Sequence, residues 1–142
     1  IYNNYQAYEA VSKADNFLVF EHLGPDFISF VISAPKALWA GLYYPLWPFE
    51  LYSLKSLIII ENWFLILLSA YTVIHIKLSL DRDVRLIVWT ALIFIIGSAI
   101  LITLSTPNLG TLSRYKTGYL LFFLPIILPA TVSRIQSILQ KA

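Results

Sequence analysis

The sequence predicts an all-α integral membrane protein with about three transmembrane helices, a re-entrant or interfacial helix pair and a short N-terminal amphipathic helix. Of its 142 residues, 58% are hydrophobic and only 13% are charged. A typical soluble domain has about 45–50% apolar and about 25% charged residues. Apolar runs long enough to cross a bilayer also recur, at residues 56–76 and 86–104. With a mean hydropathy of +0.73, the chain lacks the polar groups that would cover a soluble surface, so we expect a lipid bilayer around it.

The composition also excludes several functional classes. The net charge of +2 and the scattered cations give no basic stripe for nucleic acid. The absence of cysteine excludes disulfides, thiolate metal sites and cysteine catalysis. His22 and His75 lie far apart in the sequence, which argues against a metal site, and no phosphate-binding or dinucleotide motif is present. We therefore expect no metal, no cofactor and no nucleic-acid partner.

Residues 1–25 form a polar segment rich in tyrosine. Tyr5, Tyr8 and Val11 recur at intervals of three, which predicts a short amphipathic helix that does not cross the membrane. Gly24 and Pro25 then end the segment. The sequence opens on isoleucine and contains no methionine, so we expect a fragment of a longer polytopic protein, or alternatively a processed chain.

Residues 26–50 are apolar enough to enter a membrane, but Pro35 and Lys36 stand in the middle. Aromatic residues that favour the headgroup level follow the lysine: Trp39, Tyr43, Tyr44 and Trp47. A cation at the centre of a lone span costs several kcal/mol or more. We therefore predict a re-entrant or interfacial helix pair bent at Pro35, with a broken spanning helix as the alternative. The partner of Lys36 stays open between Glu50, Glu61 and an acidic lipid.

Residues 51–142 predict a bundle of three spans. The first, 56–76, lies between Lys55 and Lys77, and its 21 residues suffice to cross a bilayer. A polar loop, 77–85, leads to the second span, 86–104, which carries no charge. An extracytoplasmic loop at 105–117 precedes the last span, 117–133, which is interrupted by two prolines. Asp81 and Asp83 in the 77–85 loop are expected to help cap the second span.

The distribution of cations predicts the orientation. The 77–85 loop and the C-terminal tail must share a side, and together they hold five: Lys77, Arg82, Arg85, Arg134 and Lys141. The opposite side holds three, Lys55, Arg114 and Lys116, or four if residues 1–25 and Lys13 also lie there. We therefore place the 77–85 loop and the C-terminus in the cytoplasm of a bacterium and residues 1–25 outside, with the chain in the inner membrane.

The polar stretch 106–116 is predicted to be an ordered connector because Pro107 fixes one backbone angle and Gly110 permits unusual ones. On an extended segment Arg114 and Lys116 would point to one side, whereas on a helix they would diverge by about 200°. Arginine offers a planar fork of donors for a phosphate, and lysine adds a mobile charge. We expect either an anion site formed by Arg114, Lys116 and the backbone near Gly110, or cations that anchor a helix end at the interface.

Glu61 is the one charged residue inside 56–76 and the one acid–base candidate of the chain. A carboxylate in hydrocarbon must be neutral, paired or near water. It is either a proton or substrate site, or an acid near the interface that is bonded to Asn62, Lys55 or the backbone.

Three stretches together resemble a known class of protein: YYPLWPFE at 43–50, LIIIENW at 57–63, and TPNLGTLSRYK at 106–116 followed by LLFFLPIIL. Their order resembles the C-terminal part of uncharacterised bacterial polytopic membrane proteins that look like O-antigen polymerase or ligase relatives. The resemblance covers residues 26–130 and implies a setting in surface-polysaccharide synthesis. It implies a role for the following positions: Pro45, Trp47, Pro48, Glu50, Glu61, Asn108, Gly110, Arg114 and Lys116.

Three functions follow as hypotheses. The first is part of an inner-membrane protein that handles lipid-linked glycans, with a phosphate or pyrophosphate held by Arg114 and Lys116. The second is a non-catalytic accessory or scaffold subunit of a larger membrane complex, since Gly97, Ser98 and Ala99 would allow close contact with another helix. The third is a transporter, in which Glu61 would titrate in a water-filled path.

Overall fold

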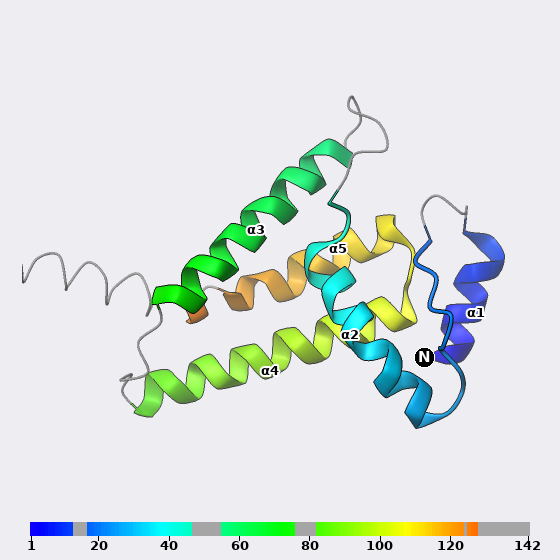
Figure 1. Ribbon diagram of the computed structural model, residues 1–142, viewed down its shortest axis with the longest axis horizontal. Helices are drawn as coiled ribbons and strands as arrows, with labels where there is room; N and C mark the ends of the chain where they lie inside the picture. The colour runs from blue at the N-terminus through cyan, green and yellow to red at the C-terminus, as the bar shows by residue number, and fades with distance from the viewer. Residues whose placement is uncertain (13–16, 47–54, 76–81, 124, 128–142) are drawn as a thin grey trace, which may run out of the picture.

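The computed structural model describes residues 1–12, 17–46, 55–75, 82–123 and 125–127. Across these residues the chain is helical, without a β-strand. Five α-helices follow one another within the described residues (Figure 1): α1 Tyr2–Val11, α2 Phe27–Tyr43, α3 Lys55–His75, α4 Arg82–Ser105 and α5 Leu109–Leu120. A short 3₁₀-helix, Leu121–Phe123, continues α5. The all-helical class predicted from the sequence is therefore confirmed for the described part of the chain.

The predicted N-terminal helix is present as α1. Tyr5 is buried on its inner face, where its hydroxyl accepts a hydrogen bond from the Phe20 backbone N–H at 3.0 Å. The sequence predicted that Val11 shares the apolar face of this helix with Tyr5, but Val11 is 81% exposed. The segment between α1 and α2 pairs with the turn before α5, because the Leu18 backbone N–H donates a hydrogen bond to the Pro107 carbonyl at 2.9 Å.

One continuous helix, α2, occupies Phe27–Tyr43, where the sequence predicted a helix pair bent at Pro35. Proline removes only one backbone donor, and the Pro35 ring lies on the exposed side of α2. The opposite side carries small buried residues that let α2 pack closely on α4: Ser33, Ala37, Ala40 and Gly41.

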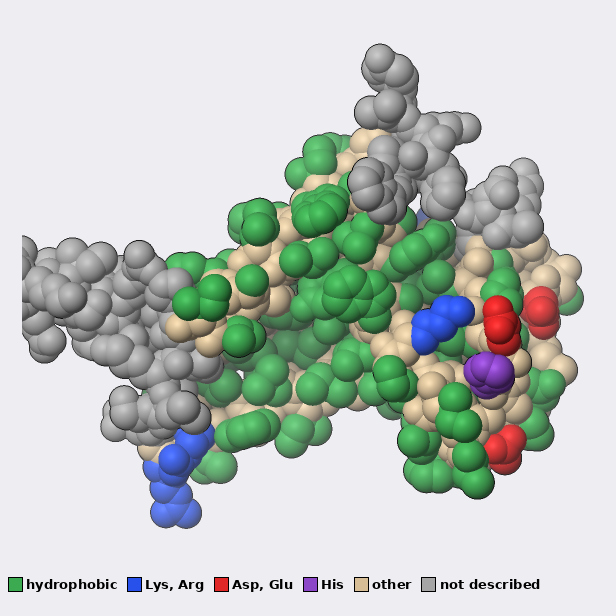
Figure 2. All heavy atoms as spheres, in the orientation of Figure 1, with side chains coloured by type: hydrophobic (Ala, Val, Ile, Leu, Met, Phe, Trp, Pro, Cys, Tyr) green, Lys and Arg blue, Asp and Glu red, His purple; other side chains and the backbone are tan. Residues whose placement is uncertain are grey.

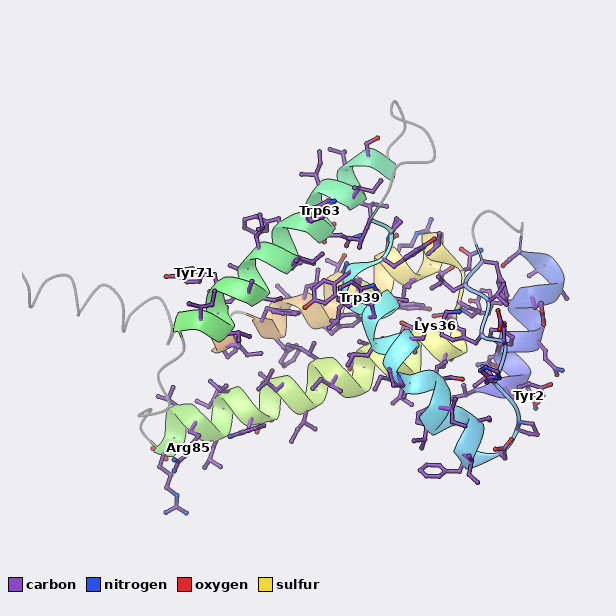
Figure 3. All side chains as sticks on the ribbon, viewed as in Figure 1. Tyr2, Lys36, Trp39, Trp63, Tyr71 and Arg85 are labelled. Atoms are coloured by element: carbon purple, nitrogen blue, oxygen red, sulfur yellow. The ribbon has the colours of Figure 1, made fainter. Side chains whose placement is uncertain are left out.

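Lys36 binds the segment between α1 and α2 and not Glu61. Its Nζ donates to the Val19 backbone carbonyl at 2.8 Å and lies 5.6 Å from the centre of the Phe20 ring. Figure 3 shows Lys36 on α2, beside the segment between α1 and α2. Glu50, the other carboxylate considered for this lysine, lies outside the described residues.

The first two predicted spans are confirmed as helices, α3 and α4. Both are long and apolar enough to cross a membrane, over Ser56–Ile74 and Arg82–Ser105. α4 begins four residues earlier than predicted, so Arg82 and Arg85 belong to its first turn and not to a loop. Asp83 lies in that first turn, as expected for a helix N-terminus. Asp81 and the rest of the predicted loop, 77–81, lie outside the described residues.

The predicted ordered connector at 106–116 is mostly helical. α5 begins at Leu109, and the Asn108 side chain caps it by accepting hydrogen bonds from the Gly110 and Thr111 backbone N–H groups. An asparagine at this position satisfies donors that the first helical turn leaves free. The predicted loop is therefore helical from Leu109 onward, and only residues 106–108 connect α4 to α5.

The last predicted span, 117–133, begins inside α5. α5 ends at Leu120, and the 3₁₀-helix Leu121–Phe123 follows directly before Pro125. Proline has no N–H to donate to the carbonyl four residues earlier, which accounts for the change of helix type. Residues 125–127 are helical, while Pro129, Arg134 and Lys141 lie outside the described residues.

Candidate functional site

The candidate site forms around Lys116, a lysine that α5 turns toward the interior. Leu112, Lys116 and Tyr119 follow one another at helical spacing and are the buried residues of α5. Lys116 is only 3% exposed. Its Nζ donates a hydrogen bond to the Asn62 Oδ1 of α3. We call this contact, together with the Pro45 carbonyl described next, the Lys116 junction.

Asn62 connects Lys116 to the segment that leaves α2. Its side chain is completely buried, and its Nδ2 donates to the Pro45 backbone carbonyl at 2.8 Å. The neighbouring Trp63 indole N–H, on α3 in Figure 3, points to the Leu46 carbonyl at 3.3 Å. The first turns of α3 therefore hold both α5 and residues 45–46, which positions Lys116 from two sides.

The electrostatics of the junction are unusual because the acceptor is neutral. Lys116 lies on α5, outside the two helices that could span a membrane. Burial lowers the pKa of its ammonium to about 8, and the Glu61 carboxylate opposes this shift. Glu61 directly precedes Asn62 and is exposed. The junction therefore combines a desolvated cation, a neutral amide and a nearby carboxylate at the surface.

The structure does not bring together Arg114, Lys116 and Gly110, the predicted anion-site residues, or Asn108, for which the resemblance implied a role. Because the stretch is helical, Arg114 lies on the exposed side of α5 while Lys116 faces inward. Asn108 caps α5, and its Nδ2 donates to the Ser12 hydroxyl at 3.1 Å. Gly110 lies exposed in the first turn. A shared phosphate site on one extended strand is thus not formed, and Lys116 is placed in a different setting from the other three.

Sequence reasoning considered Asn62 only as a partner for Glu61, not for a lysine 54 positions away. One signal was present, since asparagine is a lone amide in the apolar run 56–76. Two further polar contacts also join helices. The Tyr43 hydroxyl donates to the Ser69 Oγ at 3.1 Å, and the Tyr119 hydroxyl donates to the Gly41 carbonyl. These tyrosines fix α2 against α3 and α5.

The donor set of the junction suits an anion better than a metal ion. An ammonium and an amide N–H are hydrogen-bond donors for phosphate or carboxylate oxygens. Among the residues that the structure describes, no group of three or more His, Cys, Asp and Glu side chains gathers in one place.

Comparison of the chain with protein-family models, with curated proteins and with solved structures gives no match.

Proposed function

We propose that the chain is a module of a multi-pass bacterial inner-membrane protein that handles lipid-linked surface polysaccharide by holding its phosphate or pyrophosphate. The observation that supports this proposal is the Lys116 junction, in which a buried ammonium is held by a neutral amide. A desolvated cation without a hydrogen-bonded carboxylate gains strongly from a phosphate oxygen, because opposite charges attract each other more strongly away from water.

The outward faces of α3 and α4 support the membrane setting. Only 22% and 28% of their most apolar windows are buried inside the structure. On the face shown in Figure 2, hydrophobic side chains cover the surface along both helices, and the coloured charges lie at one end of α4 and around α1, α2 and the segment between them. A core helix of a soluble protein would bury most of such a surface, whereas a lipid-facing helix leaves it exposed to acyl chains.

The depth of the junction suits a lipid phosphate. Asn62 is the eighth residue of α3 and Lys116 is the eighth of α5. At about 1.5 Å per residue, both side chains start about 10 Å from the beginning of their helices. Arg114 lies nearer the beginning of α5 and is exposed, so it can attract an anion that Lys116 then holds.

A binding measurement tests the proposal. The detergent-solubilised chain is titrated with a fluorescent short-chain prenyl diphosphate, and the same titration is repeated with Lys116→Met and Arg114→Gln. A charge-assisted hydrogen bond contributes about 1.5–3 kcal/mol, so Lys116→Met is expected to weaken binding by about tenfold or more. Arg114→Gln should slow association and make it less sensitive to salt.

Arg85→Gln is the matched control, because it also removes one exposed cation but lies in the first turn of α4. It should leave the affinity unchanged. A wild-type chain that does not bind the prenyl diphosphate would remove the basis of the proposal.

A second candidate function is that of an accessory subunit in a larger membrane complex. One observation favours it: a Cβ added at Gly97 of α4 would meet nothing within 4 Å. A small residue on an open apolar face allows another helix to approach closely. Such a subunit would bind no prenyl diphosphate, so the same titration distinguishes the two functions. A transporter role for Glu61 has no comparable support in the structure.

A further inference from the structure

Asn62 uses both ends of its amide at once. Its Oδ1 accepts from Lys116 of α5, and its Nδ2 donates to the Pro45 carbonyl after α2. Both Asn62 and Lys116 are more than nine-tenths buried. Because both groups are buried, an anion that reaches the Lys116 ammonium must compete with the Asn62 oxygen for the space beside it.

The competition favours a phosphate. A neutral amide oxygen is a weaker partner for an ammonium than a charged oxygen is. A lysine ammonium has three donors on a flexible stem, so its Nζ can turn from one acceptor to another without a shift of the helix. Asn62 thus satisfies Lys116 in the free protein without binding it as firmly as a carboxylate would.

We propose that Asn62 is an exchangeable partner of Lys116, which an oxygen of a phosphate or diphosphate group displaces when the ligand binds. This inference rests on the proposed function and adds the residue that the ligand replaces. Displacement frees the Asn62 oxygen while its Nδ2 still faces Pro45, so ligand binding is coupled to the segment that holds Pro45 and Leu46. Asn62 is a positioning residue, because it acts on the ligand through Lys116.

Two substitutions at Asn62 are expected to change affinity in opposite directions. Asn62→Asp places a carboxylate beside the ammonium, a stronger competitor, and should weaken prenyl diphosphate binding by tenfold or more. Asn62→Leu removes the competing oxygen at similar volume and should make binding several-fold tighter. A residue that only supports the fold would weaken binding in both variants.

The experiment titrates wild type, Asn62→Asp, Asn62→Leu and the control Arg85→Gln with the same prenyl diphosphate in detergent. A thermal melt of each variant checks that it is folded, and Asn62→Ser replaces the leucine variant if that variant does not fold. Opposite shifts of the dissociation constant support the inference. Equal weakening in both variants, or unchanged affinity in Asn62→Asp, would overturn it while leaving the proposed function intact.

Two further titrations distinguish the sources of the phosphate. Inorganic pyrophosphate tests a free anion, and nanodiscs with phosphatidylglycerol test an ordinary anionic headgroup. We expect the prenyl diphosphate to show the largest difference between Asn62→Asp and wild type, because it brings a diphosphate to the depth of the junction. Failure of wild type to bind any of the three probes would overturn the inference and the proposed function together.

Discussion

Lys116 occupies a position at which an apolar residue would be expected. It lies between Leu112 and Tyr119 on the buried face of α5, and burying an ammonium costs free energy unless a partner offsets it. Asn62 supplies one hydrogen bond but no charge. The remaining cost is expressed in the lowered pKa of Lys116, about 8 against an ordinary value of 10.5.

The lowered pKa predicts a dependence of stability on pH. Between about pH 8 and pH 10.5 the unfolded chain binds a proton at Lys116 that the folded chain has released, so stability rises with pH across this window. The rise is on the order of 3 kcal/mol at most, from the size of the shift. Melting temperatures in detergent from pH 7 to pH 10.5 measure it, and Lys116→Met should remove it.

Lys36→Met is the matched control for this measurement. Lys36 is exposed and lies outside the Lys116 junction, so the slope of stability against pH that Lys116 produces should remain in this variant. A slope in Lys116→Met equal to that of wild type would show that Lys116 does not titrate as described.

The role of Lys116 could be predicted only in part. The sequence identified it as a candidate, but its charge favoured a solvent-exposed loop over a buried helix face. The spacing of Leu112, Lys116 and Tyr119 indicates that buried face. The charge of the lysine, however, made the face look polar in the sequence. Asn62 lies 54 residues away, and no local pattern connects residues so distant in the chain.

α2 and α4 share the most extensive helix–helix contact in the described part of the chain. A Cβ built on Gly41 would lie 2.6 Å from the Thr103 Oγ1 and 2.8 Å from the Ala99 backbone carbonyl oxygen. Thr103 Oγ1 is buried and has no hydrogen-bond partner among the described residues. The hydrogen on the Gly41 Cα therefore points at two oxygens, an arrangement in which weak Cα–H···O contacts support the packing.

Gly41→Ala should destabilise the protein because the added methyl group meets the backbone of α4. Backbone cannot move aside as a flexible side chain does, and overpacking costs about 1–3 kcal/mol. The variant should melt at a clearly lower temperature in detergent than wild type does.

Gly97→Ala provides the matched control on α4, since its added methyl group has open space. Alanine is favoured over glycine inside a helix by about 1 kcal/mol, so Gly97→Ala should be as stable as wild type or more stable. If both variants lost stability to the same degree, the close crossing at Gly41 would not be the cause.

The helices differ in how well the sequence predicted them. α3 and α4 were predicted nearly in full because a long apolar run leaves few alternatives to a helix. A helix pair was predicted where α2 runs through Pro35 as one helix, because one missing donor on an exposed side does not end a helix that packs through small residues on its other side. α5 was missed because Pro107, Gly110 and two cations read as a loop, although Asn108 is a favoured helix cap.

α4 is long enough to separate its two ends by the thickness of a bilayer. Its 24 residues span about 36 Å, which exceeds the roughly 30 Å of a bilayer core. Arg82 and Arg85 lie exposed in its first turn, while its last residue, Ser105, leads to the cap of α5. If α4 crosses the membrane, the first turn of α4 and the first turn of α5 must therefore face opposite compartments.

Cysteine labelling tests this orientation, because the chain has no cysteine of its own. Asp83→Cys marks the first turn of α4 and Gly110→Cys marks that of α5, and both positions are exposed. Neither substitution removes a cation, so the charge bias from which the orientation is predicted is preserved. A membrane-impermeant maleimide added to intact spheroplasts should label Gly110→Cys, whereas Asp83→Cys should react only after the membrane is permeabilised.

Gln6→Cys on α1 should behave like Gly110→Cys, since α1 and the segment after it pack beside the turn that precedes α5. Labelling of all three positions in intact spheroplasts would mean that α4 does not cross the membrane, and the reverse pattern would mean that the chain is inserted the other way round.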